Sequence, residues 1–222
     1  MKQSNTILLS ALIGVLVLLC LSLNAYAQQP VNPSFEGMYG VARSPQGWTP
    51  HGQASSPDTQ PGAWRVTTPA SHGYSYISMV CRGYSIFDSY MHEGISQFLQ
   101  SPLLAGETYH YSIDLAYSPD FKADTIRFNN PAILRVLGKN ELGQQEVLWE
   151  SAPVSNANWK TFYFSVNPSK RTTEIVLEAQ YAQLPKYCGN LLLDNMQYYR
   201  EDPNQIPVDE PKDTTVNPII YV

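Results

Sequence analysis

The chain lacks the sequence signals that mark most catalytic proteins. It contains no G-x-S-x-G nucleophile elbow, no H-E-x-x-H zinc motif, no metal-type cysteine spacing and no phosphate-binding P-loop. Its four histidines are scattered along the sequence: His51, His72, His92 and His110. Acidic pairs such as Glu93 with Asp114 could serve glycoside hydrolysis, but nothing in the local sequence marks them for it. We therefore expect a protein without enzymatic activity.

Basic residues are also scarce. The sequence has 14 Lys and Arg against 19 Asp and Glu, a formal net charge of −5. Proteins that bind nucleic acid or anionic membranes attract those surfaces with an excess of positive charge. The charge balance therefore disfavours both as partners.

The N-terminus carries the pattern of an export signal. Lys2 is the only charge before an apolar run from Ile7 to Leu23, and Asn24-Ala25-Tyr26-Ala27 then places small residues at positions −3 and −1. The alternative is an uncleaved anchor, but the run is shorter than the about 20 apolar residues that a membrane span needs. We predict that residues 1–27 are a signal peptide and that the mature chain is extracellular or on the cell surface, without membrane insertion. Its net charge would be 13 − 19 = −6, since cleavage removes Lys2.

Cysteine is rare as well. Of the three cysteines in the chain, Cys20 lies in the signal, which leaves Cys81 and Cys188. An even pair in an exported protein favours a disulfide, which would stabilise the fold by a few kcal/mol, on the order of 2–4. The alternative is two separate buried thiols.

Helical periodicity is absent outside the signal, and strand patterns dominate the rest. In the clearest case Tyr109, Tyr111, Ile113 and Leu115 alternate with polar side chains, which is typical of a half-buried strand. Further strands are predicted at 63–67, 74–81, 94–100, 132–137, 146–149, 162–166, 175–179 and 190–199. About ten short strands indicate a β-sandwich. The stretches 44–62 and 118–131 are predicted to be long loops, where binding residues usually sit.

The composition changes abruptly after Arg200. Repeated Pro with acidic residues predicts a stiff, solvated linker that cannot bury a core. The linker leads to a short apolar stub from Pro218 to Val222, which looks like the opening of a further domain, or is a frayed tail. We therefore predict one folded domain at residues 28–200, followed by a linker and stub at 201–222.

Aromatic residues are abundant, with 15 Tyr and 4 Trp. Their rings combine an apolar face with a polar edge, which suits stacking on sugar rings, although a sandwich core also needs them. Trp149 and Trp159 stand beside regular strands and are expected in the core. Trp48 and Trp64 flank a segment rich in Pro, Gly and Ser, which makes them candidates for ligand contact.

Several short motifs resemble the cellulose- and xylan-binding jelly-roll type of carbohydrate-binding module, whose fold is galactose-binding-domain-like. They are Asn32-Pro33-Ser34-Phe35-Glu36, Ser101-Pro102-Leu103, Gly106-Glu107-Thr108-Tyr109, Asn158-Trp159-Lys160 and Leu193-Asp194-Asn195. The likeness covers roughly residues 31–200 and lies mainly in spacing. Ser56-Pro57-Asp58, residues 73–82 and residues 93–97 also resemble domains in secreted surface proteins of gliding bacteria. The resemblance implies an all-β jelly-roll β-sandwich that binds a polysaccharide or glycan.

The resemblance further implies a structural calcium ion. Carried over by position, its ligands would be Glu36 and Asp194, with carbonyl oxygens from the loop around residues 71–73. Calcium takes six to eight oxygen ligands, so two carboxylates with carbonyls are compatible. The alternative is that both carboxylates bond backbone amides.

Ligand-contact residues do not carry over by position, because their places vary among such modules. Our candidates are Trp64, Arg82, Tyr84, Glu93 and Gln97, followed by Trp48 and Tyr117. Arg82 and Glu93 bracket an irregular segment at 83–90, although they could form only a strand-to-strand ion pair.

The sequence hypothesis is a secreted, non-catalytic module for a polysaccharide or glycan. The rival is a structural or adhesive module of a gliding-associated cell-surface protein, with further domains of a larger protein as partners. An exposed aromatic strip on the concave sheet face would favour the first, and a polar face the second.

Overall fold

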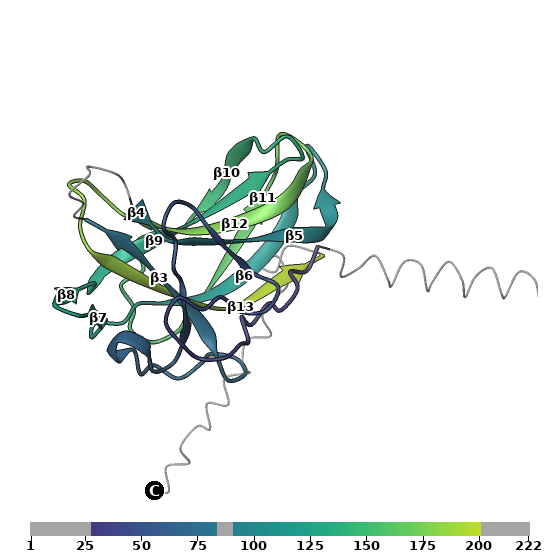
Figure 1. Cartoon of the computed structure of the whole chain (residues 1–222). Coiled ribbons are helices and arrows are strands. Elements are labelled where there is room, and N and C mark those ends of the chain that lie inside the picture. Colours follow the sequence, from purple (N-terminus) through teal and green to yellow (C-terminus); the bar gives the residue numbers. More distant parts are fainter. Residues whose placement is uncertain (1–27, 84–90, 201–222) are drawn as a thin grey trace, which may run out of the picture.

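The protein is a two-layer β-sandwich. A computed structural model of the chain describes residues 28–83 and 91–200 (Figure 1). The strands are β1 Thr49–His51, β2 Asp58–Gln60, β3 Tyr76–Arg82, β4 Met91–His92, β5 Gly94–Leu103, β6 Tyr109–Ala116, β7 Lys122–Ala123, β8 Ile126–Arg127, β9 Asn130–Lys139, β10 Gln145–Glu150, β11 Lys160–Val166, β12 Thr172–Tyr181 and β13 Gly189–Tyr199. A single 3₁₀ turn, η1, spans Ala63–Arg65 within the described residues. The predicted all-β jelly-roll sandwich is confirmed.

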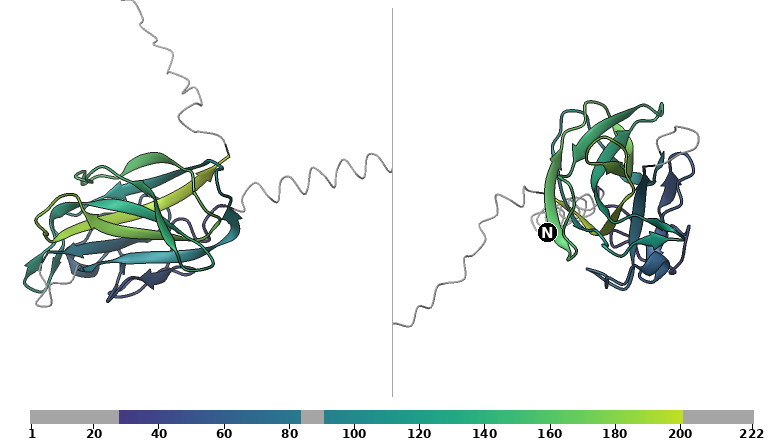
Figure 2. Two further views of the ribbon diagram at one scale, coloured as in Figure 1. Left: turned by 90° about the horizontal axis from the view of Figure 1, so that it is seen from above. Right: turned by 90° about the vertical axis from the view of Figure 1, so that its left-hand side faces the viewer.

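The two layers are parts of one curled sheet. The first layer has the strand order β1-β5-β12-β9-β10, and the second has β11-β6-β13-β3-β2 with β4 beside β3. A short parallel pairing of β9 with β13, at Asn130 opposite Gly189, joins the layers, whereas the other pairings are antiparallel. Figure 2 shows the layers stacked across the core. No helix among the described residues is long and apolar enough to cross a membrane.

The main core lies between the layers and follows the predicted alternation. Tyr111, Ile113 and Leu115 of β6 face Ile175 and Leu177 of β12, and all five side chains are fully buried. Burying each such side chain stabilises the fold by about 1.5–3 kcal/mol. Alternation of apolar and polar residues therefore fixes which face of each strand turns inward.

A second apolar cluster lies on the outer side of the second layer. It is made of Val66, Tyr76, Val80, Ala116, Phe121, Phe128 and Leu192. The turn η1 and the β7–β8 hairpin cover this cluster, since their residues Trp64, Ala123 and Ile126 pack against it. Burial of this cluster holds two irregular segments over β3, where the candidate site is formed.

The sequence prediction was wrong at residues 63–67. That segment is not a strand, because Trp64 and Arg65 have φ angles of +53° and +67°, in the left-handed region. The predicted loops at 44–62 and 118–131 also contain the short strands β1, β2, β7 and β8. Strands of two or three residues carry too little periodicity to be predicted, since their pairing depends on distant neighbours.

Candidate functional site

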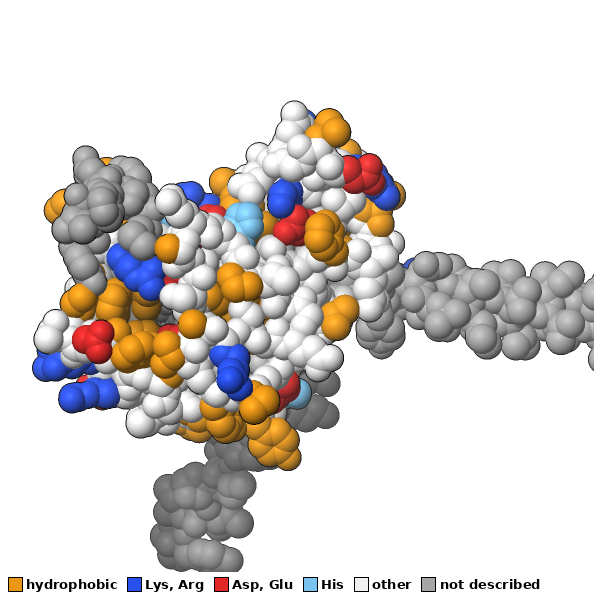
Figure 3. Space-filling view, viewed as in Figure 1, with side chains coloured by type: hydrophobic (Ala, Val, Ile, Leu, Met, Phe, Trp, Pro, Cys, Tyr) orange, Lys and Arg blue, Asp and Glu red, His pale blue; other side chains and the backbone are white. Residues whose placement is uncertain are grey.

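A small pocket opens over β3, between η1 and the β7–β8 hairpin. Its cavity volume is ≈ 150 Å³, and we call it the β3 pocket. Trp64, Phe121 and Phe128 supply apolar wall, while Asp58, Arg82 and Glu93 supply charged groups. In Figure 3 a hollow lies in this region, with apolar side chains between basic and acidic ones. Three of the predicted ligand-contact residues, Trp64, Arg82 and Glu93, are therefore brought together.

Arg82 and Glu93 form a buried ion pair at the pocket. The Arg82 Nη2 atom lies 2.7 Å from Glu93 Oε1, and the two side chains are 21% and 2% exposed. The Ser56 hydroxyl also donates to Oε1, and the backbone N–H of Val80 donates to Oε2 at 3.0 Å. Both oxygens of Glu93 are thus occupied, so this side chain positions Arg82 instead of reacting.

Asp58 is the second buried carboxylate of the pocket. It lies on β2, is 4% exposed, and accepts a hydrogen bond from the backbone N–H of Ala42 at 2.9 Å. Burial raises its pKa to about 6, and the charge of Glu93 adds to the rise, although the hydrogen bonds from Ala42 and the Trp64 indole lower it. A carboxyl group that titrates near neutral pH inside a pocket is typical of a functional site.

The backbone around Trp64 is unusual and directs the indole to the pocket. Trp64 has φ +53° and ψ +32°, which is uncommon for a residue other than glycine. The turn is held by a hydrogen bond from the backbone N–H of Ala63 to the Gln60 side chain and by one from Gly62 N–H to the Val66 carbonyl. A strained conformation that the surroundings fix in this way supports a functional role for Trp64.

Two other predicted contact residues have structural roles instead. Trp48 is 3% exposed, packs on Phe35 with ring centroids 5.1 Å apart, and donates its indole N–H to the Asn32 carbonyl. Gln97 is 6% exposed, accepts from the Val31 N–H and donates to the Val31 and Gly47 carbonyls. Both side chains anchor the N-terminal segment in the fold and are not available to a ligand.

The remaining two candidates do not add to the pocket. Tyr117 follows β6, where its backbone N–H donates to the Asn156 carbonyl, and it is not one of the lining residues. Tyr84 lies outside the described residues. Asp58, Phe121 and Phe128 were missed by sequence reasoning, because the loops predicted at 44–62 and 118–131 were expected to carry binding residues but nothing in the sequence singled out these three as ligand contacts.

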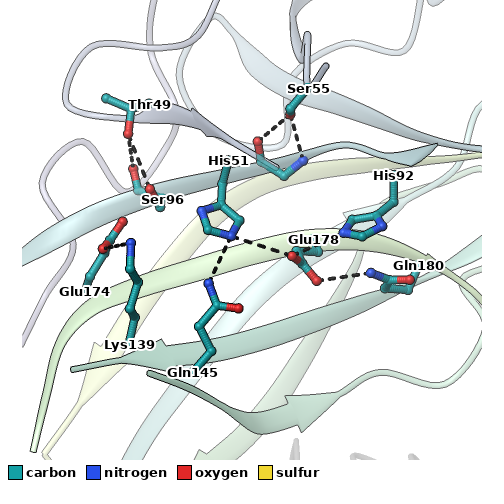
Figure 4. Close-up of polar contacts among 11 residues, drawn as sticks. Thr49, His51, Ser55, His92, Ser96, Lys139, Gln145, Glu174, Glu178 and Gln180 are labelled. Carbon is teal, nitrogen blue, oxygen red and sulfur yellow. Dashed lines mark hydrogen bonds and ion pairs between the residues drawn. The ribbon is translucent and has the colours of Figure 1, made fainter. Parts of the chain in front are cut away.

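The outer face of the first layer carries a polar network that the sequence analysis also missed (Figure 4). Glu178 of β12 lies 3.2 Å from His92 Nε2 and 3.8 Å from His51 Nε2, and it accepts a hydrogen bond from Gln180 at 3.1 Å. The sequence pattern could have predicted this network, since polar residues at 174, 178 and 180 alternate with the core residues of the same strand. Phe98, at 74% exposure, is a strongly exposed aromatic on this face, next to Glu174. The face is therefore mainly polar and bonded to itself.

This network predicts a pH-dependent loss of stability in Glu178→Gln. Burial alone would raise the pKa of Glu178, but the hydrogen bonds from His92 and Gln180 and the charges of His92 and His51 together outweigh it and lower the pKa from its ordinary value. The ionised form then stabilises the fold above the unfolded-state pKa, and this contribution is lost as the pH falls through the folded-state pKa. We expect the variant to lose about 1–2 kcal/mol near neutral pH.

Denaturant unfolding at several pH values checks this expectation. The difference between wild type and Glu178→Gln should shrink as the pH falls and vanish once the pH is below the lowered folded-state pKa of Glu178. Glu150→Gln is the control, because Glu150 pairs with Arg135 at 2.6 Å but is 41% exposed, and we expect a change below about 0.5 kcal/mol. A loss in Glu178→Gln that does not change with pH would contradict the assignment.

The predicted calcium ligands hold a loop. Glu36 accepts hydrogen bonds from the backbone N–H groups of Tyr74 and Ser75, at 2.9 and 3.2 Å. Asp194 accepts from those of Ser71 and His72, at 2.8 Å each. Burial raises the pKa of Asp194 to about 7, although the amide hydrogen bonds lower it. We call this arrangement the carboxylate–amide clasp.

The clasp does not fit a shared calcium ion as its residues are placed. Calcium needs six to eight oxygen ligands, whereas the atoms that face these carboxylates are N–H groups, which repel a cation. No group of three or more His, Cys, Asp or Glu side chains among the described residues could hold a metal ion. The calcium ion stays a sequence prediction that these contacts do not support.

Chelation distinguishes a clasp held by amide hydrogen bonds from one held by a calcium ion. We expect the thermal midpoint of the protein to be the same with and without a chelator, because amide hydrogen bonds need no ion. Added calcium should not raise the midpoint, since a ligand stabilises only the state that binds it. A midpoint that falls with chelator and is restored by calcium would contradict the clasp and support the ion.

The predicted disulfide is not formed. Cys81 and Cys188 are both free thiols. In the β3–β13 ladder Cys81 lies opposite Gly189, so Cys188 is offset by one residue, and a one-residue offset turns a side chain to the other face of the sheet. Cys81 accordingly lies in the main core, and Cys188 packs against the outer cluster. Burial raises the pKa of Cys81 to about 12, so this thiol is not reactive.

Comparison with known proteins gives matches in fold. No family model matches the chain, and no curated protein matches it in sequence. An arabinose-bound GH51 α-L-arabinofuranosidase matches with a TM-score of 0.55 and 13% identity over 79% of this chain and 26% of that chain. The chain thus spans about a quarter of the length of that enzyme.

Two smaller domains also match. The CBM22-1 xylan-binding domain of Paenibacillus barcinonensis Xyn10C matches with a TM-score of 0.46 and 17% identity over 74% of this chain and 89% of that chain. The K2 adhesin domain of Lys-gingipain matches with a TM-score of 0.47 and 13% identity over 76% of this chain and 97% of that chain. At these identities the likeness concerns the fold alone. A carbohydrate-binding module, the class that the sequence motifs resemble, is thus among the solved structures similar to this chain.

Proposed function

We propose that the protein is a non-catalytic glycan-binding module and that the β3 pocket holds one sugar residue. The observation that carries the proposal is the joining of an aromatic wall, Trp64 with Phe121 and Phe128, to the polar groups of Asp58 and Arg82. Aromatic rings pack on the apolar face of a sugar, while charged groups bond its hydroxyls. No other described cavity combines several aromatic walls with buried charged groups.

The size of the pocket limits the ligand. Sites for drug-sized molecules have volumes of roughly 300–1,000 Å³. The β3 pocket, at ≈ 150 Å³, is smaller, so it suits a single ring at the end or branch of a glycan. A single small site implies modest affinity, with a dissociation constant on the order of 0.01–1 mM.

The arrangement of the carboxylates favours binding over hydrolysis. Glycosidases use two carboxyl groups that are both accessible to the glycosidic bond. In the β3 pocket Glu93 is 2% exposed and has both oxygens occupied, by Arg82, Ser56 and Val80. Asp58 is then the one buried carboxylate left to face a ligand. We therefore expect no hydrolysis products when the protein is incubated with glycans.

Trp64→Ala tests the proposal on a glycan array and in polysaccharide pull-downs. We expect the substitution to weaken binding at least about 10-fold, which corresponds to 1.4 kcal/mol of lost stacking energy. Tyr163→Ala is the matched control, because Tyr163 is an aromatic at 47% exposure on β11 that does not line the pocket, and it should bind like wild type. Glycan binding that survives Trp64→Ala unchanged would contradict the site.

A structural or adhesive module of a cell-surface protein is the second candidate. It is favoured by the polar face of the first layer, where Glu178 is bonded to His92 and Gln180 and no strip of exposed aromatics is found among the described residues (Figure 4). Wild-type protein that binds no glycan on the array would leave this candidate standing. Export, the domain limits, further domains of a larger protein and a role in gliding are expectations from the sequence.

A further inference from the structure

The charges that line the β3 pocket do not balance. Asp58, Glu93 and Asp124 are acidic, and Arg82 is the one basic residue among the lining residues, so the ionised pocket carries 1 − 3 = −2. The ion pair at 2.7 Å neutralises Glu93. Asp124 lies exposed at the rim, where water screens its charge. The excess charge that matters is therefore that of Asp58.

Asp58 forms no ion pair among the residues that the structure describes. Its neighbours are the Ala42 N–H and the Trp64 indole, which donate hydrogen bonds, and the Glu93 charge, which opposes ionisation. The Arg82 guanidinium, already paired with Glu93, has the smallest effect on it. A buried carboxylate without a charge partner is costly, and a bound cation in the adjacent cavity would supply that partner.

The aromatic wall of the same cavity also favours a cation. An ammonium group over the face of a tryptophan is stabilised by the ring quadrupole, by about 0.5–2 kcal/mol depending on desolvation. Trp64 lines the cavity with Asp58, so a ligand ammonium can meet the carboxylate while its ring packs on the indole. An anionic sugar would face two unfavourable groups instead, Asp58 and Asp124.

We propose that the β3 pocket selects a sugar with a free amino group, a cationic hexosamine, over neutral, N-acetylated and acidic sugars. The inference rests on the proposed glycan-binding function and names the ligand class of that site. Asp58 contacts the ammonium, Trp64 packs on the sugar ring, and Arg82 bonds a hydroxyl. An N-acetyl group removes the positive charge and enlarges the ligand, so it is disfavoured twice.

The proposal has a pH signature. Attraction of the ammonium requires the ionised form of Asp58, whose pKa burial raises to about 6. Affinity for the amino sugar should therefore fall as the pH drops from about 6.5 to about 5, where Asp58 gains a proton. It should also fall as the pH rises above about 7, because the neighbouring ring oxygens keep the pKa of a 2-amino sugar several units below that of lysine and the ligand amine then loses its proton. Affinity for a neutral sugar should change little over the same range.

Calorimetry with oligomers of glucosamine, N-acetylglucosamine and glucose of the same linkage tests the proposal, with an oligomer of glucuronic acid as the anionic probe. We expect the glucosamine oligomer to bind at least about 5-fold more tightly than the others at about pH 6.5, and this preference to shrink at both about pH 5 and about pH 8.5. Asp58→Asn should abolish the preference, so that the glucosamine and glucose oligomers bind with affinities within about 2-fold of each other. Asp120→Asn is the control, because Asp120 is an exposed carboxylate outside the pocket and should behave like wild type.

The possible results separate the inference from the proposed function. Equal affinity for the glucosamine and glucose oligomers, or a preference that ignores pH, overturns the amino-sugar inference and leaves glycan binding intact. Choline that binds as tightly as the glucosamine oligomer overturns the sugar part of the inference. Wild-type protein that binds no sugar overturns both the inference and the proposed function. The wild-type pH series keeps the test decisive if Asp58→Asn fails to fold, which thermal melting would reveal.

Discussion

Gly73→Ala is expected to destabilise the protein by about 3 kcal/mol, through strain and loss of the carboxylate–amide clasp. Gly73 has φ +71°, and a Cβ atom added there would lie 1.8 Å from Glu36 Oε1. The left-handed conformation costs a residue with a side chain about 1–2 kcal/mol. Glu36 must also move away from the N–H groups of Tyr74 and Ser75, which weakens its hydrogen bonds to them. A hydrogen bond to a charged group contributes about 1.5–3 kcal/mol when it is fully formed.

Gly106→Ala is the matched control for this prediction. Gly106 has φ +77°, but a Cβ atom there would meet nothing within 4 Å. It should therefore lose only the conformational part, about 1 kcal/mol. Denaturant unfolding measures the free energy of unfolding of both variants, and the extra loss in Gly73→Ala is the contribution of the carboxylate–amide clasp. Equal losses would show that Glu36 contributes nothing to holding this loop.

Arg82→Ala is expected to cost about 3–5 kcal/mol, because it leaves a buried charge without its partner. Glu93 is 2% exposed, and its Oε1 atom lies 2.7 Å from the guanidinium. The hydrogen bonds from Ser56 and Val80 would continue to hold the carboxylate in place, so it could not turn outward to water. The loss should appear as a lower midpoint in urea without a change in slope.

Arg135→Ala tests whether burial causes the effect. Arg135 lies 2.6 Å from Glu150, but the two side chains are 34% and 41% exposed. Exposed ion pairs are worth about 0–1 kcal/mol, so the variant should be nearly as stable as wild type. Similar losses in Arg82→Ala and Arg135→Ala would contradict the description of Arg82 and Glu93 as a buried pair.

The fold was largely predictable, because alternation along long strands is a local signal. The pattern through Tyr111, Ile113 and Leu115 predicts the buried face of β6 correctly, and the same holds for β12. The short strands β1 and β2 could not be predicted in this way, since each is held by a partner that is distant in sequence. The strand prediction at residues 63–67 was wrong for another reason, because the left-handed φ angles of Trp64 and Arg65 leave no trace in the hydrophobic pattern.

The site was predictable only in part. Trp64, Arg82 and Glu93 were found because they flank irregular segments, where binding residues concentrate. Asp58 was missed because a carboxylate acquires its raised pKa only from tertiary burial, which the sequence does not show. The disulfide prediction failed because counting cysteines ignores strand register, which places Cys188 on the face opposite to Cys81.

The central claim is that glycans bind at the β3 pocket, and a titration followed by the four tryptophan indole N–H signals in an NMR spectrum tests it most directly. The indoles of Trp48 and Trp159 donate to the carbonyls of Asn32 and Pro69, and the partly buried Trp149 stacks on Phe164 against the core, so a ligand in the pocket should leave these three signals in place. The account predicts that a glycan which binds the protein shifts the signal of Trp64 alone. Binding that shifts another indole and leaves Trp64 unchanged would contradict it.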